Sequence, residues 1–111
     1  MRRPYTPHPD DPTADADPEA VFAVLEDADC RSFLQALEDP LTAAELSRRC
    51  GVPSSTTYRK LDRLTTVGLV ESAPEVCGER NHRARYYRSV ESIRFAIGDG
   101  SLALDAETAD G

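Results

Sequence analysis

The chain is poor in the residue types that build several common classes of protein. Its 111 residues include no tryptophan, one methionine and three widely separated cysteines. An odd number of scattered cysteines does not form a disulfide framework. The longest stretch without a charged residue, 50–58, is largely polar, whereas a membrane helix needs about 20 apolar residues. No secretory or membrane signal is present, and we therefore expect a cytoplasmic protein.

Motifs for catalysis and cofactor binding are also missing. The two histidines, His8 and His82, stand far apart in the sequence. Neither a glycine-rich phosphate loop nor a nucleophile elbow occurs. No combination of thiol, imidazole and carboxylate has the spacing of a complete metal site. We therefore expect a protein that is not an enzyme and that holds no metal or cofactor.

Two acidic tails are expected to flank a single domain. Five of the eight prolines lie within residues 1–18, among Asp, Thr and Ala. Such a segment cannot bury enough apolar surface to offset the entropy lost on ordering it. We expect residues 1–17 to be a disordered, proline-rich tail and residues 105–111 to be a second disordered tail. The domain then spans residues 18–104.

Charge is sorted along the chain, although the net charge of −7 argues alone against a nucleic-acid partner. Residues 1–45 carry a net charge of −8, residues 46–94 a net charge of +5, and residues 95–111 a net charge of −4. An ordinary surface would mix the two signs. The basic segment is therefore the part of the chain in which an interface with DNA is expected.

Lysine is almost absent, because 12 of the 13 basic residues are arginine. This usage, together with abundant Asp and Glu, resembles proteins of salt-accumulating microbes, especially haloarchaea; the alternative is an ordinary acidic protein. At about 1 M salt, charges are screened beyond about 3 Å. Counterion release then adds little to DNA affinity, and binding depends on close arginine contacts.

Periodic apolar residues and end signals predict four helices. Asp17 and Pro18 begin the first helix, 18–26, and a second helix ends before Pro40. A capping box, Thr42 to Glu45, opens the third helix. The fourth helix, 54–67, stops at a glycine. Within it, three residues recur at helical spacing and predict a buried inner face: Thr57, Leu61 and Leu64.

Two β-hairpins are predicted after the helices. The first is a wing around the polar loop 74–83, and its contact region with DNA is 74–85. The second is a hairpin over 93–104, in which apolar residues alternate on both sides of a Gly-Asp-Gly turn. A hairpin cannot bury its apolar face alone, so it packs on the domain or on a second subunit. These elements predict an α+β fold, mainly α: a winged helix-turn-helix with four helices, a β wing and a C-terminal β-hairpin.

The pattern of small and aliphatic residues carries a family resemblance. From Val21 to about Tyr87 the chain resembles ArsR-type winged helix-turn-helix regulators, and more loosely MarR-type ones. The residues that match are Leu46, Ser47, Gly51, Thr57, Leu61, Leu64, Gly68, Leu69 and Val70. Two features depart from the family: residues 54–57 lack the paired cysteines of the metal sensors, and a hairpin replaces the closing helix.

The resemblance implies a sequence-specific transcriptional regulator of double-stranded DNA, with repression as the commoner role in the family. It also implies a homodimer, formed through helix 18–26 or hairpin 93–104, and leaves any small effector unknown. The alternative is a winged helix that acts as a protein-interaction module or adaptor of the transcription machinery. Exposed tyrosines would then anchor a protein partner.

The predicted DNA contacts come from the fourth helix and the wing. Hydroxyl and guanidinium groups are the side-chain groups that pair with phosphates and base edges. The helix, expected in the major groove, contributes Ser54, Ser55, Thr56, Tyr58, Arg59, Lys60 and Arg63. The wing, expected at the backbone or minor groove, contributes Arg80, His82, Arg83 and Arg85.

One cysteine stands apart from the other two. Cys30 and Cys50 fall on inner helical positions and are predicted to be small core residues. Cys77 falls in the polar wing loop, close to arginines that can lower the pKa of a thiol. It is a candidate redox sensor, or half of a metal site with His82; the alternative is an ordinary loop thiol.

Overall fold

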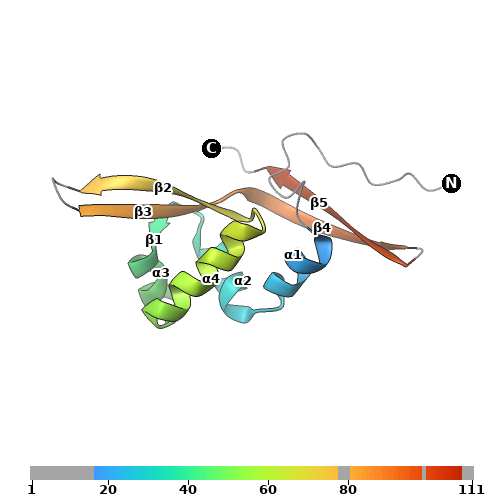
Figure 1. Ribbon diagram of the computed structural model, residues 1–111, viewed down its shortest axis with the longest axis horizontal. Coiled ribbons are helices and arrows are strands. Elements are labelled where there is room, and N and C mark those ends of the chain that lie inside the picture. Colours follow the sequence, from blue (N-terminus) through green and yellow to red (C-terminus); the bar gives the residue numbers. More distant parts are fainter. Residues whose placement is uncertain (1–16, 78–80, 99, 109–111) are drawn as a thin grey trace.

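The computed structural model describes residues 17–77, 81–98 and 100–108; the side chains of 75–77, 81–83 and 108 lie outside that description. The described residues form four helices and five strands, which confirms the predicted α+β winged helix-turn-helix with its C-terminal hairpin (Figure 1). In chain order the elements are α1 (Pro18–Leu25), α2 (Ala28–Ala36), β1 (Leu41–Thr42), α3 (Ala43–Cys50), α4 (Ser54–Thr66), β2 (Val70–Cys77), β3 (Asn81–Arg88), β4 (Val90–Gly98) and β5 (Ser101–Thr108).

Local signals set the helix boundaries as predicted. Asp17 caps α1 by accepting a hydrogen bond from the Glu19 amide at 3.1 Å. In the capping box of α3, Thr42 Oγ1 accepts from the Glu45 amide at 3.2 Å, and Glu45 Oε1 accepts from the Thr42 amide at 2.9 Å. α3 ends at Gly51, whose φ of 66° is left-handed and therefore suits glycine. Only residues 51–53 then separate α3 from α4.

The inner face of α4 is buried in the core, as predicted. Thr57, Leu61 and Leu64 each have an exposed fraction of 0%. The two leucines belong to the same hydrophobic core as Phe33 of α2. The Thr57 hydroxyl donates to the Val52 carbonyl at 3.3 Å, so its polar group is satisfied inside the protein. This packing fixes which side of α4 faces outward.

The wing is more regular than predicted. A three-stranded antiparallel sheet has the order β1-β3-β2, so β2 is an outer strand. β2 and β3 stay paired as far as Cys77 and Asn81, although the sequence predicted a loop over 74–83. Pro74 indicated the end of a strand, because proline has no backbone N–H to donate. An outer strand tolerates it, since one edge of that strand has no neighbouring strand to accept a hydrogen bond. The predicted contact region 74–85 is therefore mostly paired β-structure.

β4 and β5 form the predicted C-terminal hairpin as a separate two-stranded sheet, with Gly100 at a φ of +76° in its turn. Leu104 and Ala106 of β5 are buried in the helical core. The rings of Phe22 in α1 and Phe95 in β4 meet edge to face, with 5.3 Å between their centroids. The hairpin thus packs on the domain beside α1, and it reaches beyond α1 at the end opposite the wing (Figure 1).

The C-terminal boundary of the domain needs correction. Residues 105–108 continue β5 and are not part of a disordered tail. Asp105 pairs in register with Arg94, and Ala106 pairs with Ile93. Cross-strand pairing and the burial of Ala106 thus extend the strand past the last large aliphatic residue. The other predicted tail residues, 1–16 and 109–111, lie outside the described part of the chain.

Within the described part, no helix has the length and apolar character of a membrane span.

Candidate nucleic-acid interface

One stripe of α4 faces solvent. Ser55, Tyr58, Arg59 and Asp62 are all exposed, and Tyr58 retains 58% of its accessible surface. Their spacing of three, four and seven residues places them on one side of a helix. Among the described residues, the Arg59 side chain has no hydrogen bond or ion pair within the protein. We call Ser55, Tyr58, Arg59 and Asp62 the outer face of α4.

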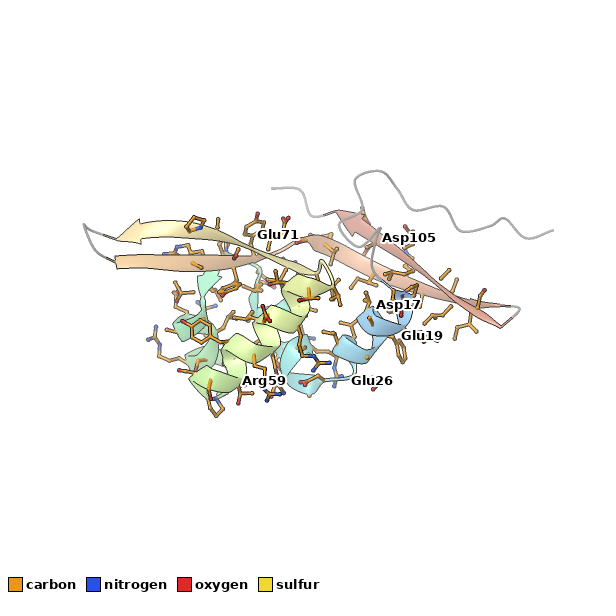
Figure 2. All side chains as sticks on the ribbon, viewed as in Figure 1. Asp17, Glu19, Glu26, Arg59, Glu71 and Asp105 are labelled. Carbon is orange, nitrogen blue, oxygen red and sulfur yellow. The ribbon has the colours of Figure 1, made fainter. Side chains whose placement is uncertain are left out.

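Acidic side chains lie both at the α1 end of the molecule and beside α4. Figure 2 shows Asp17, Glu19 and Asp105 around α1 and the hairpin, Glu71 on β2, and Arg59 on α4. Carboxylates also lie within 4.0 Å of Lys60 and Arg63 of α4. The sorting of charge along the sequence is therefore only partly kept in the fold.

Lys60 and Arg63 have different surroundings from those predicted. The Lys60 ammonium lies 2.9 Å from Asp27 Oδ2 and 2.7 Å from Asp29 Oδ2, and its side chain is only 13% exposed. Arg63 Nη1 lies 3.7 Å from Asp27 Oδ2. The two residues are three positions apart and therefore lie on one side of α4. That side faces α2, because both cations pair with Asp27. Their predicted contact with DNA stays a prediction, and carboxylates within the protein already balance their charge.

Asp27 is the centre of this α2–α4 clamp, which consists of Asp27, Asp29, Lys60 and Arg63. Its Oδ1 also caps α2, accepting from the Asp29 amide at 2.8 Å and the Cys30 amide at 3.3 Å. The hydrogen bond from Lys60 lowers the pKa of the Asp27 carboxyl, and the two amides act in the same direction. Hydrogen bonds to Asp29 and Asp27 raise the pKa of the Lys60 ammonium. Both shifts favour the charged forms, so the clamp holds α4 against α2 at neutral pH.

The structure places the predicted wing residues unevenly. Arg85 lies on β3, with Nη1 at 3.8 Å from Glu45 Oε1 and at 3.3 Å from the Pro40 carbonyl, to which it donates. His82 and Arg83 belong to the backbone of β3, but their side chains are outside the description. Arg80 is outside the described residues altogether. The wing contacts with DNA thus stay predictions.

Of the two cysteine side chains that the structure describes, only one is fully buried. Cys30 is buried and Cys50 is half-buried, and burial raises the pKa of both thiols, which keeps them protonated at neutral pH. Cys77 is the last residue of β2 and not a loop residue, and its side chain is outside the description. Its sensing role stays a prediction. In residues 17–77, 81–98 and 100–108, no three His, Cys, Asp or Glu side chains form a group that could hold a metal.

A groove of about 400 Å³ separates α4 from the wing sheet. Its lining residues are Tyr58, Arg59, Asp62, Thr65, Ser72 and Tyr86. Burial raises the pKa of the Tyr86 hydroxyl, and the nearby Tyr58 and Asp62 add to the shift. The site predicted from the sequence contains only neutral and basic side chains and so omits Asp62. A helical projection would have found it three residues after Arg59 on the same side.

Comparison with known families agrees with this geometry. Residues 25–73 match a family model described as a helix-turn-helix domain. The matched segment begins at the end of α1, contains α2, α3 and α4, and ends within β2. None of the curated proteins matches the chain. The chain therefore contains a helix-turn-helix domain, which confirms that part of the predicted resemblance.

The α2–α4 clamp predicts a defined pH dependence. The pKa of Asp27 is lowered by folding, so its contribution to stability is complete above the unfolded-state pKa of about 3.9 and is lost as the pH falls through the folded-state value. Asn also caps helices well, so Asp27→Asn removes the charge and retains the cap. We expect this variant to have a lower free energy of unfolding than the wild type at pH 7. The difference should shrink below about pH 4.

Urea unfolding followed by circular dichroism at several pH values measures this difference. Glu38→Gln is the control, because Glu38 is exposed and has no ion pair or hydrogen bond with another described residue. A difference between Asp27→Asn and the wild type that stays constant from pH 7 to pH 3 would contradict the clamp.

Proposed function

We propose that this protein is a sequence-specific regulator of transcription that acts in the cytoplasm as a repressor. The single observation that carries the proposal is the outer face of α4, which a helix-turn-helix domain presents to solvent. On this face, the Arg59 guanidinium has no hydrogen bond or ion pair with another described residue. In helix-turn-helix proteins, the second helix of the motif enters the major groove of DNA. The repressor role follows from the family resemblance alone.

Arg59 and Tyr58 are the proposed base-reading residues. A guanidinium donates two hydrogen bonds to O6 and N7 of guanine, which is the commonest specific contact in the major groove. The hydroxyls of Ser54 and Ser55 stand in the first turn of α4, whose cap residue Pro53 offers no side-chain hydrogen bond. The backbone amides of these two serines stand at the N-terminus of the helix, where they can donate hydrogen bonds to a phosphate. The wing residues Arg80, His82, Arg83 and Arg85 would then contact the backbone or the minor groove.

The proposed binding depends on short-range contacts more than on total charge. Lys60, Arg63 and Arg85 each have a carboxylate within 4.0 Å. Cations that are already paired release fewer counterions from DNA, and the affinity term that depends on salt is correspondingly small. Binding of this kind suits the high-salt habitat that the composition predicts, because long-range attraction is screened there in any case.

Arg59→Ala tests the proposal. We expect it to weaken binding to a preferred duplex by about 1–3 kcal/mol, because it removes one bidentate base contact. The duplex is first selected from a random library with the wild-type protein, and affinities are measured by gel shift at low and high salt. Arg94→Ala is the matched control, since Arg94 lies on the hairpin with 71% of its side chain exposed.

An equal loss in the two variants would contradict base reading by Arg59, because it would show that only net charge matters. A wild-type protein that retards no duplex at either salt concentration would contradict the proposed function. It would favour the alternative of a protein-interaction module or adaptor of the transcription machinery.

We further propose a homodimer joined through α1 and the hairpin. The sequence left helix 18–26 and hairpin 93–104 as separate alternatives, yet the contact between Phe22 and Phe95 makes them one surface. Phe22 is 47% exposed and Ile97 is 87% exposed. Ile97 pairs with Leu102 and lies on the same side of β4 as Phe95. We call Phe22, Phe95, Ile97 and Leu102 the α1–hairpin face.

A second copy of the chain suits the α1–hairpin face. The four residues carry no charge, and a two-fold axis brings the same patch of each copy together, so no complementary charge is needed. Dimeric helix-turn-helix proteins place their recognition helices about 34–36 Å apart, in successive major grooves of a palindromic site. A dimer would therefore supply the second recognition helix.

Two neighbouring residues on opposite sides of β4 test the dimer. Ile97→Asp places a charge on the α1–hairpin face, whereas Ala96→Asp places the same charge on the other side of the strand, where Ala96 is also exposed. We expect sedimentation equilibrium to show a dimer for the wild type and Ala96→Asp, and at least a tenfold weaker dimer for Ile97→Asp. A monomeric wild type, or equal effects of the two substitutions, would contradict this surface.

A further inference from the structure

We infer that Asp62 is a determinant of DNA sequence preference, as an acceptor for the amino group of a base. The inference rests on the proposed function, because it concerns the same outer face of α4. Every DNA contact predicted from the sequence involves a neutral or a basic side chain. Asp62 is the one acidic member of the outer face, and it follows Arg59 by three residues.

The Asp62 carboxylate is free to act on a partner. It is exposed, and among the described residues its side chain has no hydrogen bond and no ion pair. The bond from Thr66 Oγ1 at 2.8 Å goes to the Asp62 backbone carbonyl and leaves the carboxylate untouched. Two nearby cations of α4, Lys60 and Arg63, are directed to Asp27 in the α2–α4 clamp. The clamp thus leaves the carboxylate unneutralised.

Asp62 also stands where DNA would pass. It lines the groove between α4 and the wing together with Arg59 and Tyr86. A winged domain that lays α4 in the major groove brings base edges and backbone close to this groove. A carboxylate repels phosphates and the acceptor atoms N7, O6 and O4 of the bases. Asp62 therefore opposes binding wherever the protein is aligned on the DNA so that only hydrogen-bond acceptors of the bases lie near its carboxylate.

Amino groups are the donors that the major groove offers. They are N4 of cytosine and N6 of adenine, and Asp and Glu accept hydrogen bonds from cytosine N4. Three helical residues rise about 4.5 Å, and bases are stacked about 3.4 Å apart along each strand. Arg59 and Asp62 therefore reach base pairs that are neighbours or nearly so. Arg59 donates hydrogen bonds and selects guanine. Asp62 accepts a hydrogen bond and selects an amino-bearing base one or two steps away.

Asp62→Asn tests this role without changing the shape of the side chain. Wild type and variant are each used to select duplexes from a random library, and affinities are then measured for the preferred duplex and for its single-base changes. We expect both proteins to keep the guanine that Arg59 reads. At the neighbouring position, the wild type should prefer cytosine by about 5- to 100-fold over guanine or thymine. The variant should lose most of this preference for cytosine and turn to adenine, because an Asn amide accepts from adenine N6 and donates to N7.

Glu19→Gln is the control for net charge, because Glu19 lies at the α1 end of the molecule and its side chain is exposed (Figure 2). It should leave every base preference unchanged. Thermal unfolding checks that Asp62→Asn is folded, which its exposed position leads us to expect.

The outcomes separate this inference from the proposed function. A wild-type protein that selects no sequence would overturn both. A wild type and a variant that select the same base at the same ratio would overturn the role of Asp62 alone. An equal gain of affinity for all duplexes would also overturn it, because simple loss of charge repulsion gives that result.

Discussion

The surface that α4 offers depends on how its other two sides are held. Its inner side is packed in the core through Leu61 and Leu64, which are fully buried. Its flank is tied to α2 by Lys60, which bridges Asp27 and Asp29. A helix held by packing on one side and by charge on another has little freedom to turn. The outer face is therefore presented as a rigid surface, as recognition of a fixed target requires.

The clamp also changes what the charge asymmetry of the sequence means. Residues 46–94 carry a net charge of +5, yet Lys60, Arg63, Arg85 and Arg88 each lie within 4.0 Å of a carboxylate. Much of the basic segment is thus paired with carboxylates of the protein. What remains on the outer face is a donor, Arg59, beside an acceptor, Asp62. In the proposed complex with DNA, such a pair would distinguish base sequences and would add little attraction for DNA in general.

Local patterns predicted most of the fold, because caps, turns and periodicity act over a few residues. The capping box at Thr42, the buried side of α4 and the C-terminal hairpin were all predicted. Interactions between distant segments were not: Asp27 precedes its partner Lys60 by 33 residues. The extension of β5 to Thr108 likewise depends on pairing with β4. For the same reason, the sequence predicted the buried side of α4 but not the pairing of Lys60 and Arg63 with Asp27.

Mapping the contact surface in solution tests the central claim most directly. Amide chemical shifts of the ¹⁵N-labelled protein would be followed by NMR during titration with a selected duplex. We expect the largest changes at Ser55, Tyr58, Arg59 and Asp62, with small changes at Glu19 and Arg94. Changes centred on α1 or on the hairpin, with α4 unaffected, would contradict the claim that the outer face of α4 is the DNA-binding surface.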